Sequence, residues 1–305
     1  MTAKLPITAV ILAFNEETHI ARCLARIVPV VERVVVVDSF STDQTAGIAR
    51  ENGADVLQNP WTNYATQFQW ALDHAQLRTP WVLRLDADEY LEAALALELR
   101  KKLSDLPPDV TGISFRRKVI FRGRWIRWGG YYPTVLLRLW RRDAARIEAR
   151  WMDEHMVLTR GRSITFSADL VDENLHDISW WTAKHNSYAT RQMIDFIARE
   201  EPLFPRDRAI ETAGGSFQAR RRRFLRDRVF ARAPLYLRAT LYFLFRYFAL
   251  LGFLDGRQGF VFHFLQGWWN WMLVDAKIDE ARRLIRAEGL DAFRSHCLHR
   301  HGIAL

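Results

Sequence analysis

The fold class of this 305-residue chain is decided by the stretch Trp81-Val82-Leu83-Arg84-Leu85-Asp86-Ala87-Asp88-Glu89. Its largely apolar first part has the length of a buried strand, and two carboxylates follow where that strand ends. Upstream, β-branched runs alternate with stretches whose apolar residues recur at helical spacing. The runs lie at 7–13, 34–37 and 54–57, and the helical stretches at 17–26, 41–49 and 64–76. This alternation predicts an α/β fold with a Rossmann-like, mostly parallel sheet, whose ligands bind at the carboxyl ends of the strands.

Polar residues follow three of these predicted strands. They are Asn15-Glu16-Glu17, Asp38-Ser39 and Asp86-Ala87-Asp88. Two carboxylates at a sheet edge suit Mg²⁺ or Mn²⁺, and such an ion can bridge to a diphosphate. The alternative is structural, because aspartates at strand ends are also common turn and cap residues.

Asp38 has the same two interpretations. A carboxylate at this position can hold ribose hydroxyls or a base edge, or it can form an Asx-type turn with Ser39 and Ser41. Asp43 is interpreted as a helix cap. We expect backbone and Asn15 contacts to a base, and a mostly structural Glu17 at a helix N-terminus.

The pattern of predicted secondary structure and the composition of the chain change at two places after residue 111. Short β-rich runs at 113–121, 135–140 and 164–166 predict hairpins added to the sheet, and 180–199 is predicted helical. Residues 216–246 hold nine arginines and one acid, and 236–271 hold thirteen aromatic residues. We therefore expect two domains, with residues 1–215 forming the α/β domain and 216–305 a basic, aromatic-rich helical region.

Charge and composition restrict the class of protein. Apolar residues make up 49% of the chain, which excludes a disordered protein. Residues 1–100 carry a net charge of −5 and the remaining residues +14, so the second half suits anionic partners. The longest uncharged stretch, 258–274, is short and polar for a spanning helix, which favours a peripheral or monotopic membrane association. The two cysteines, Cys23 and Cys297, indicate a reduced, cytosolic-side protein.

Several motifs together resemble a known family. A-F-N-E-E follows the first strand, V-V-D-S-F-S-T-D-Q-T spans the second strand's end, and L-D-A-D-E follows the fourth. Their order and spacing resemble the family-2 inverting glycosyltransferases with the GT-A fold. Trp61 with Tyr64, Ala65 and Gln67, and the G-F-L-D-G run at 252–256, look like bacterial lipopolysaccharide-core and capsule glycosyltransferases. Ser39 is a departure, since many members carry a second aspartate there.

The resemblance implies a nucleotide-sugar donor, a UDP-sugar, whose site includes Ala13, Asn15, Glu17, Asp38, Asp86 and Asp88. Asp86 and Asp88 would hold Mg²⁺ or Mn²⁺. The catalytic base would lie in the pair Asp153 and Glu154, with Glu154 preferred. A histidine is a third metal ligand in some GT-A enzymes, so His155 and His176 have two interpretations, a metal ligand or a residue that only makes a hydrogen bond, and the second is favoured. Arg138 and Arg127 would clamp phosphate or acceptor, unless they are solvated arginines of an edge strand.

The implied activity is transfer of one sugar to a lipid-linked saccharide in cell-envelope polysaccharide or lipopolysaccharide synthesis. It would take place on an anionic membrane surface, at the cytoplasmic face of the inner membrane. The competing hypothesis is a basic membrane- or nucleic-acid-binding protein with a non-catalytic nucleotide-binding fold. The tail's aromatic residues are interleaved with aliphatic ones, which favours membrane and argues against a nucleic-acid partner. No G-x-G-x-x-G is present, which argues against a dinucleotide site.

Overall fold

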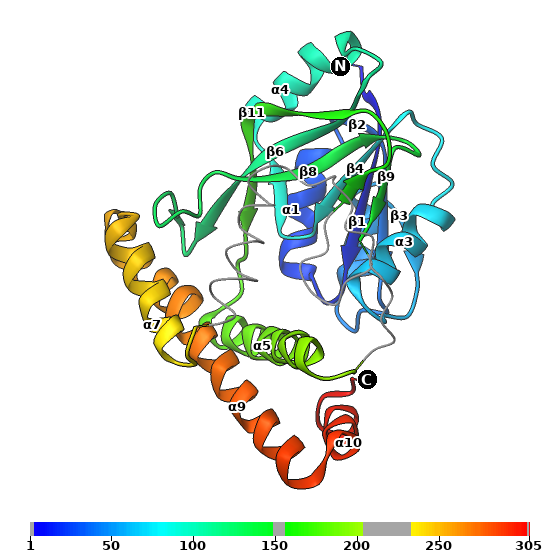
Figure 1. The fold of residues 1–305 in the computed structure, drawn as a ribbon. Helices are drawn as coiled ribbons and strands as arrows, with labels where there is room; N and C mark the ends of the chain where they lie inside the picture. Colours follow the sequence, from blue (N-terminus) through cyan, green and yellow to red (C-terminus); the bar gives the residue numbers. More distant parts are fainter. Residues whose placement is uncertain (1–2, 149–155, 204–232, 304) are drawn as a thin grey trace. The chain divides into compact units, whose positions relative to one another are not determined.

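The computed structural model describes residues 3–148, 156–203, 233–303 and 305 (Figure 1). Contacts between residues divide the chain into two compact units, with the division between His176 and Asp177. The predicted domain boundary at 215/216 lies outside the described residues and stays a prediction.

The first unit begins with the alternating strands and helices that the sequence predicts. In chain order these are β1 (Leu5–Ala13), α1 (Glu17–Ile27), β2 (Val31–Asp38), α2 (Thr45–Glu51), β3 (Asp55–Gln58), α3 (Tyr64–His74) and β4 (Trp81–Asp86). The four strands pair in parallel in the order β3-β2-β1-β4. Successive residues of β1 point to opposite faces, so Ile7, Ala9 and Ile11 enter one apolar core and Val10 the other. Both faces are buried, which explains the unbroken apolar runs.

The rest of the sheet is mixed. It consists of β5 (Glu89–Leu91), β6 (Val110–Phe121), β7 (Arg124–Trp125), β8 (Thr134–Arg141) and β11 (Arg162–Glu173), and the sheet continues from β4 in the order β8-β6-β11-β5. β8 is antiparallel to both β4 and β6, and β7 forms a hairpin with β6. β11 pairs in parallel with β6, so this last run is a crossover and not the predicted hairpin. A separate ribbon joins β9 (Ala145–Ile147) to β10 (Met156–Leu158).

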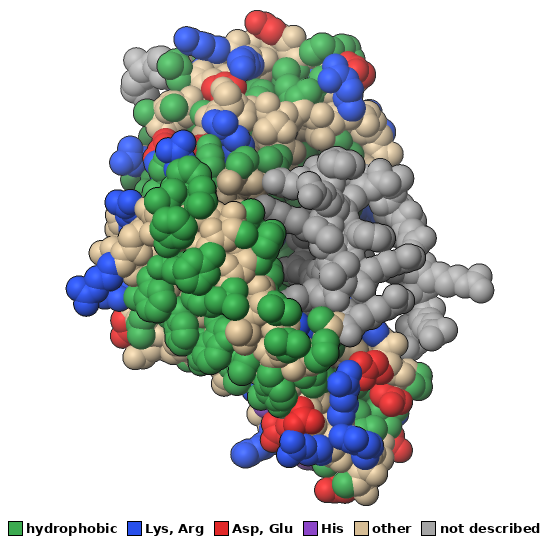
Figure 2. Space-filling model, turned by 60° about the vertical axis from the view of Figure 1, so that its left-hand side comes forward, with side chains coloured by type: hydrophobic (Ala, Val, Ile, Leu, Met, Phe, Trp, Pro, Cys, Tyr) green, Lys and Arg blue, Asp and Glu red, His purple; other side chains and the backbone are tan. Residues whose placement is uncertain are grey.

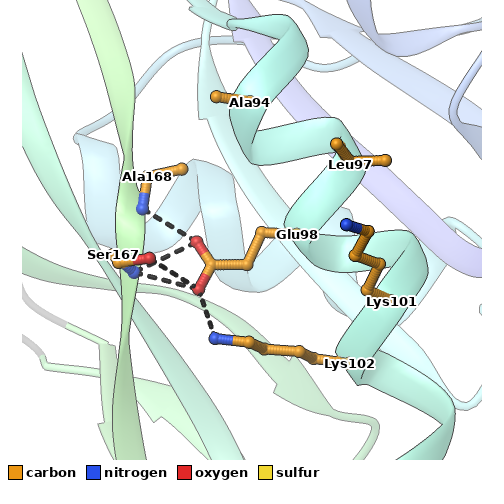
Figure 3. A pocket seen from close by; sticks show the side chains of 7 residues that line it. All are labelled: Ala94, Leu97, Glu98, Lys101, Lys102, Ser167 and Ala168. Carbon is orange, nitrogen blue, oxygen red and sulfur yellow. Dashed lines mark hydrogen bonds and ion pairs between the residues drawn. The ribbon is translucent and has the colours of Figure 1, made fainter.

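Helix α4 (Ala93–Lys102), followed by the 3-10 turn η1 (Leu103–Asp105), stabilises an irregularity in β11 (Figure 3). The register of β11 against β6 shifts between Thr165 and Asp169, which takes amides out of the ladder. The carboxylate of Glu98 accepts hydrogen bonds from the backbone N–H groups of Ser167 (3.1 Å) and Ala168 (2.8 Å), and Lys102 pairs with it at 2.7 Å. Glu98 therefore replaces the ladder bonds that the irregularity removes.

The second unit is helical. Its elements are α5 (Ile178–Glu200), α7 (Leu237–Leu244), the π-helical η3 (Phe245–Ala249), the 3-10 turn η4 (Gly252–Asp255), α8 (Gly256–Phe262), the π-helical η5 (His263–Trp269), α9 (Asn270–Glu288) and α10 (Leu290–His301). Asp177 caps α5 by accepting from the Trp180 N–H at 2.8 Å. Residues of α5, α9 and α10 form an apolar core of their own, and Arg238 pairs with Asp275 in the interior of the unit.

One stretch of this unit exposes many large apolar side chains, and we call it the apolar wedge, residues 236–260. Of the nineteen exposed large hydrophobic residues in the described chain, eleven belong to it: Tyr236, Leu237, Leu241, Leu244, Phe245, Phe248, Leu250, Leu251, Phe253, Leu254 and Phe260. Figure 2, turned to bring the α7 side forward, shows hydrophobic side chains gathered on one face.

Among the described residues, no single helix has both the length and the apolarity to cross a membrane. The segments Leu237–Ala249 and Gly252–Glu288 meet these criteria only as a pair, and a 71° bend separates them. The membrane association predicted from the sequence stays a prediction.

Candidate active site

The carboxyl ends of the three central parallel strands lie level at one edge of the sheet. In the β1–β2 ladder Ala13 faces Asp38, and in the β1–β4 ladder Leu12 faces Asp86. Neighbouring strands are about 4.8 Å apart. The polar residues that the sequence places after these strands are therefore brought to one edge, as the parallel arrangement predicts.

The loop after β2 is closed by hydrogen bonds of its own. Asp38 is fully buried, and its carboxylate accepts from the Ser41 N–H (3.1 Å), the Ser41 hydroxyl and the Gln58 amide (3.0 Å). The Asx-type turn considered for Asp38 is thus present. Gln67 on α3 donates to the hydroxyl of Ser39 at 3.0 Å, so the side chain of Ser39 has a structural partner.

Asn15 and Glu17 connect the end of β1 to this same loop. Asn15 adopts a left-handed backbone (φ 54°), its N–H donates to Ser41 Oγ at 2.9 Å, and its side-chain oxygen accepts from the Thr42 N–H at 2.8 Å. Glu17 accepts from the Gln44 N–H at 3.0 Å. Both side chains thus have structural partners, and their predicted contacts to a nucleotide stay predictions.

The loop after β4 contains a charge cluster that joins the half-buried Asp86 to the buried residues Glu89 and Arg138. Asp86 accepts from the Tyr64 hydroxyl at 2.7 Å through one carboxylate oxygen and from Arg138 at 3.1 Å through the other. Arg138 also pairs with Glu89, which is 1% exposed, and Glu89 accepts from the Asp86 N–H at 3.0 Å. Arg84 lies over the Tyr64 ring at 4.2 Å. One guanidinium group is therefore shared by two carboxylates.

Burial and charge shift the pKa values of these two carboxylates in opposite directions. Burial alone would raise the pKa of Asp86, but the guanidinium groups of Arg138 and Arg84 outweigh it and hold that pKa well below its usual range. Burial raises the pKa of Glu89 to about 8 despite Arg138, and the charges of Asp86 and Asp172 add to the rise. The cluster accordingly keeps Asp86 ionised and favours a proton on Glu89.

Asp88 lies beside the end of β11. Its carboxylate accepts from the Asn174 amide at 3.1 Å, and Asn174 in turn accepts from the His176 N–H at 3.0 Å. Asp172 lies nearby and pairs with Arg117 at 3.4 Å. Burial raises the pKa of Asp172 to about 6 in spite of Arg117, with further contributions from Asp88 and Asp86. Carboxylates are thus crowded where β4 and β11 end.

A group of Glu16, His19 and His176 borders this cluster, with possible ligand atoms within 4.8 Å of one another. His19 is fully buried, its Nδ1 lies 2.6 Å from Glu16, and its Nε2 accepts from the Leu175 N–H at 2.8 Å. The acceptor role of Nε2 places the proton of the neutral ring on Nδ1, which donates to Glu16. Both nitrogens of His19 are engaged, so it fixes the start of α1 against the segment after β11.

The structure brings together only part of the predicted set. Ala13, Asn15, Glu17, Asp38, Asp86 and Asp88 lie at the carboxyl edge of the sheet, and His176 follows β11 near Asp88. Asp153, Glu154 and His155 lie outside the described residues, so the catalytic base stays a prediction.

The interpretation of Arg138 as a solvated edge-strand residue is wrong. β8 lies between β4 and β6, and Arg138 is 4% exposed. Arg127 lies over the rings of Trp125 and Trp128, at 5.2 and 5.7 Å.

Sequence reasoning missed four residues of the cluster: Arg138 as the shared partner, Glu89, Asp172 and Asn174. Asp172 and Asn174 were not predicted as site residues because the irregularity in β11 interrupts the alternation of apolar residues that marks a strand. A carboxylate at the carboxyl end of a strand, the signal that identified Asp38 and Asp86, could have identified Asp172. Tyr64 and Gln67 were noted only as parts of a motif. Their hydrogen bonds to Asp86 and Ser39 give that motif a structural reason.

The mostly parallel α/β sheet with carboxylates at its carboxyl edge is a GT-A-like fold. The family model described as "Glycosyl transferase family 2" matches residues 8–170, which is more than half of the chain. The chain therefore belongs to glycosyl transferase family 2, and the resemblance seen in its motifs is confirmed.

Individual relatives match shorter regions. The lipopolysaccharide core biosynthesis glycosyltransferase LpsC of Rhizobium meliloti (strain 1021) is 34% identical over 158 residues, covering 48% of this chain and 55% of LpsC. An uncharacterized glycosyltransferase of Rickettsia felis is 40% identical over 93 residues, covering 30% of this chain and 32% of that protein. The chain thus spans about half or less of the length of these relatives.

Among solved structures, glucosyl-3-phosphoglycerate synthase from Mycobacterium tuberculosis, in complex with Mn²⁺, uridine diphosphate and glucosyl-3-phosphoglycerate, is similar to part of the chain. It is 25% identical, with a TM-score of 0.31 over 38% of this chain and 44% of that one.

Proposed function

We propose that this protein is an inverting glycosyltransferase that moves one sugar from a nucleotide-sugar, a UDP-sugar, to a lipid-linked saccharide. The observation that carries the proposal is the alignment of Ala13, Asp38 and Asp86 at one sheet edge, with Asp88 immediately beyond. Ligands of open α/β sheets bind at this edge. Membership of glycosyl transferase family 2 supports the reaction class.

The donor set at Asp88 and Asp86 fits a divalent cation such as Mg²⁺ or Mn²⁺. A carboxylate offers about four lone-pair positions, and Asp86 uses two of them for Tyr64 and Arg138. Asp88 accepts one hydrogen bond, from Asn174. Burial is the main cause of the raised pKa values of Glu89 and Asp172, and neighbouring carboxylates add to the rise, a part that a cation would relieve. Asp88 and Asp86 would hold the ion, which when bound neutralises charge on the departing diphosphate.

The chain's own residues would do the remaining work. Arg138 and Tyr64 fix the orientation of the Asp86 carboxylate, so this carboxylate is already in place before the nucleotide-sugar binds. Asp38 and Asn15 would contact the nucleoside from the loops after β2 and β1. Inversion requires a base that takes the proton of the acceptor hydroxyl as it attacks the anomeric carbon from the face opposite the leaving group. We assign this role to Glu154, with Asp153 beside it.

The relative LpsC supports the proposed acceptor, and the basic region 216–305 supports the proposed location. The name of the relative LpsC links it to lipopolysaccharide core biosynthesis, which supports a saccharide acceptor of the cell envelope. The basic, aromatic-rich region 216–305 supports association with an anionic membrane, at the cytoplasmic face of the inner membrane. No nucleic-acid partner is part of this proposal.

A thermal-shift screen of nucleoside diphosphates, with and without Mn²⁺, tests the donor site. A ligand present at 100 times its Kd stabilises the native state by about 2.7 kcal/mol, so uridine diphosphate with Mn²⁺ should raise the Tm by several degrees. Asp88→Asn should remove the Mn²⁺-dependent part of the shift. A wild-type protein that shows no shift with any nucleoside diphosphate would contradict the proposal.

A further inference from the structure

We propose that the apolar wedge, residues 236–260, dips into the headgroup–acyl boundary of an anionic bilayer and returns to the same side. This inference deepens the membrane location proposed above, and it does not depend on which sugar is transferred. Eleven large apolar side chains of the wedge are at least 37% exposed, from Leu250 at 37% to Phe248 at 57%. Concentrated apolar exposure of this kind marks an interaction surface.

The shape of the wedge suits a re-entrant segment better than a span. Its first arm, Leu237–Ala249, is about 20 Å long at 1.5 Å per residue, whereas a bilayer's hydrocarbon core is about 30 Å thick. The next helical segment, Gly252–Glu288, leaves at a bend of 71°. Exposed apolar residues flank the bend on both sides: Leu250, Leu251, Phe253 and Leu254. The bend thus lies within the exposed apolar surface.

The bend is held by a set of close contacts within the G-F-L-D-G motif and its neighbours. Leu251 has a left-handed backbone (φ 60°), and a Cβ on Gly252 would lie 2.9 Å from His263 Nε2. Asp255 and His263 are both buried and pair at 3.2 Å. Gly259 packs so tightly on Asp255 that a Cβ there would lie 2.2 Å from Asp255 Cβ. The polar groups of Asp255 and His263 thus meet each other inside the protein, and the residues on either side of the bend expose apolar side chains.

The charges of this segment favour an anionic lipid surface as the partner. From Leu237 to Val274 the sequence contains one acidic residue, Asp255, which is buried against His263. Arg257 is exposed and Arg246 half-buried. The wedge therefore combines apolar bulk with positive charge and shows no acid at its surface, which is the pattern that anionic headgroups attract.

Flotation of the full-length protein with vesicles of phosphatidylglycerol and phosphatidylethanolamine tests the location. The wild type should float with the vesicles, and the double variant Phe253→Glu and Leu254→Glu should bind at least about tenfold more weakly, since two side chains lose apolar burial and gain negative charge. The matched control is Leu298→Glu on α10, because Leu298 is 50% exposed but lies outside the wedge. We expect this control to bind like the wild type.

Insertion depth tests the re-entrant shape. Cys23 and Cys297 are buried, so a single introduced cysteine can be labelled with an environment-sensitive dye at Leu254 or at Leu237. In vesicles containing spin-labelled lipids, a dye at Leu254→Cys should be quenched most by labels on the upper part of the acyl chains, and a dye at Leu237→Cys by labels near the headgroups. Equal depths at both positions would overturn the re-entrant arrangement.

Two further outcomes would overturn the proposal as a whole. One is wild-type flotation by the Phe253→Glu and Leu254→Glu variant. The other is a lipid-free dimer that this variant dissociates, because a second copy of the chain would then be the partner of the wedge. Thermal shift with uridine diphosphate and Mn²⁺, measured on the same proteins, separates this test from the proposed transferase activity.

Discussion

The loops after β2 and β4 look alike in the sequence and differ in the structure. Each follows a parallel strand and is rich in aspartate, yet the loop after β2 uses the Asp38 carboxylate for Ser41 and Gln58. In the loop after β4, Asp86 and Glu89 share one arginine, and Asp88 has the Asn174 amide as its partner. Aspartates at strand ends therefore do not by themselves mark a binding site. What distinguishes the second loop is an ion-paired cluster in which two carboxylates share the buried Arg138.

The largest expected effect is loss of transfer in Asp88→Asn. If Asp88 helps to hold the cation, turnover should fall at least about 10³-fold, because about 4 kcal/mol of charge stabilisation is lost. The Tm should stay close to the wild-type value, since Asn retains the shape and a partner for Asn174.

The matched control is Asp43→Ala in the other loop. Asp43 accepts from the Thr45 N–H at 2.9 Å, so this variant should lose about 0.5–2 kcal/mol of stability and keep turnover within about threefold. Equal activity losses in Asp88→Asn and Asp43→Ala would erase the distinction between the two loops.

Arg138→Met should produce the largest loss of stability. Removing the shared guanidinium leaves the buried Glu89 carboxyl without its cation and takes one of its partners from the half-buried Asp86, which costs about 3–5 kcal/mol. Urea denaturation measures this cost. Adding Glu89→Gln to the same variant should restore part of the stability, and a double variant less stable than Arg138→Met alone would show that Glu89 is not the residue left unpaired.

The substitution Asp38→Asn tests whether Asp38, in the loop after β2, contacts the nucleoside or has only a structural role. The substitution weakens hydrogen bonds from Ser41 and Gln58 to a charged acceptor, for which we expect a loss of about 1.5–3 kcal/mol. If Asp38 also contacts the nucleoside, the KM for the donor rises while kcat is kept. Steady-state kinetics on the folded fraction would distinguish this from a structural role, in which neither constant moves.

The smallest effect is a pH dependence of stability in the cation-free protein. The pKa of Asp172 is raised from 3.8 to about 6, so the native state binds its proton more tightly than the unfolded chain does. Its contribution to stability is complete below about pH 4 and is lost as the pH rises through 6. Urea midpoints measured from pH 4 to 7 should therefore fall less steeply in Asp172→Asn, and parallel curves would contradict the shift.

Much of the parallel half of the sheet was predictable, because its strands are buried on both faces and their apolar runs end at polar residues. The interpretation of Arg138 failed for a related reason. In L-L-R-L-W a single charge suggests a solvated face, and only the position of β8 between β4 and β6 puts Arg138 inside. Asp172 was hidden by the register shift that Glu98 stabilises. Local patterns thus predict the strands and their ends, whereas partnerships between distant strands depend on sheet order.

The position of β8 also has a consequence for synthesis of the chain. β1 to β4 are complete by residue 86, but the strand that covers the open edge of β4 consists of residues 134–141. During translation, therefore, about fifty further residues must leave the ribosome before that edge is paired. Until Arg138 emerges, Asp86 and Glu89 lack the guanidinium that they share in the folded protein, at the place where the two halves of the sheet will join.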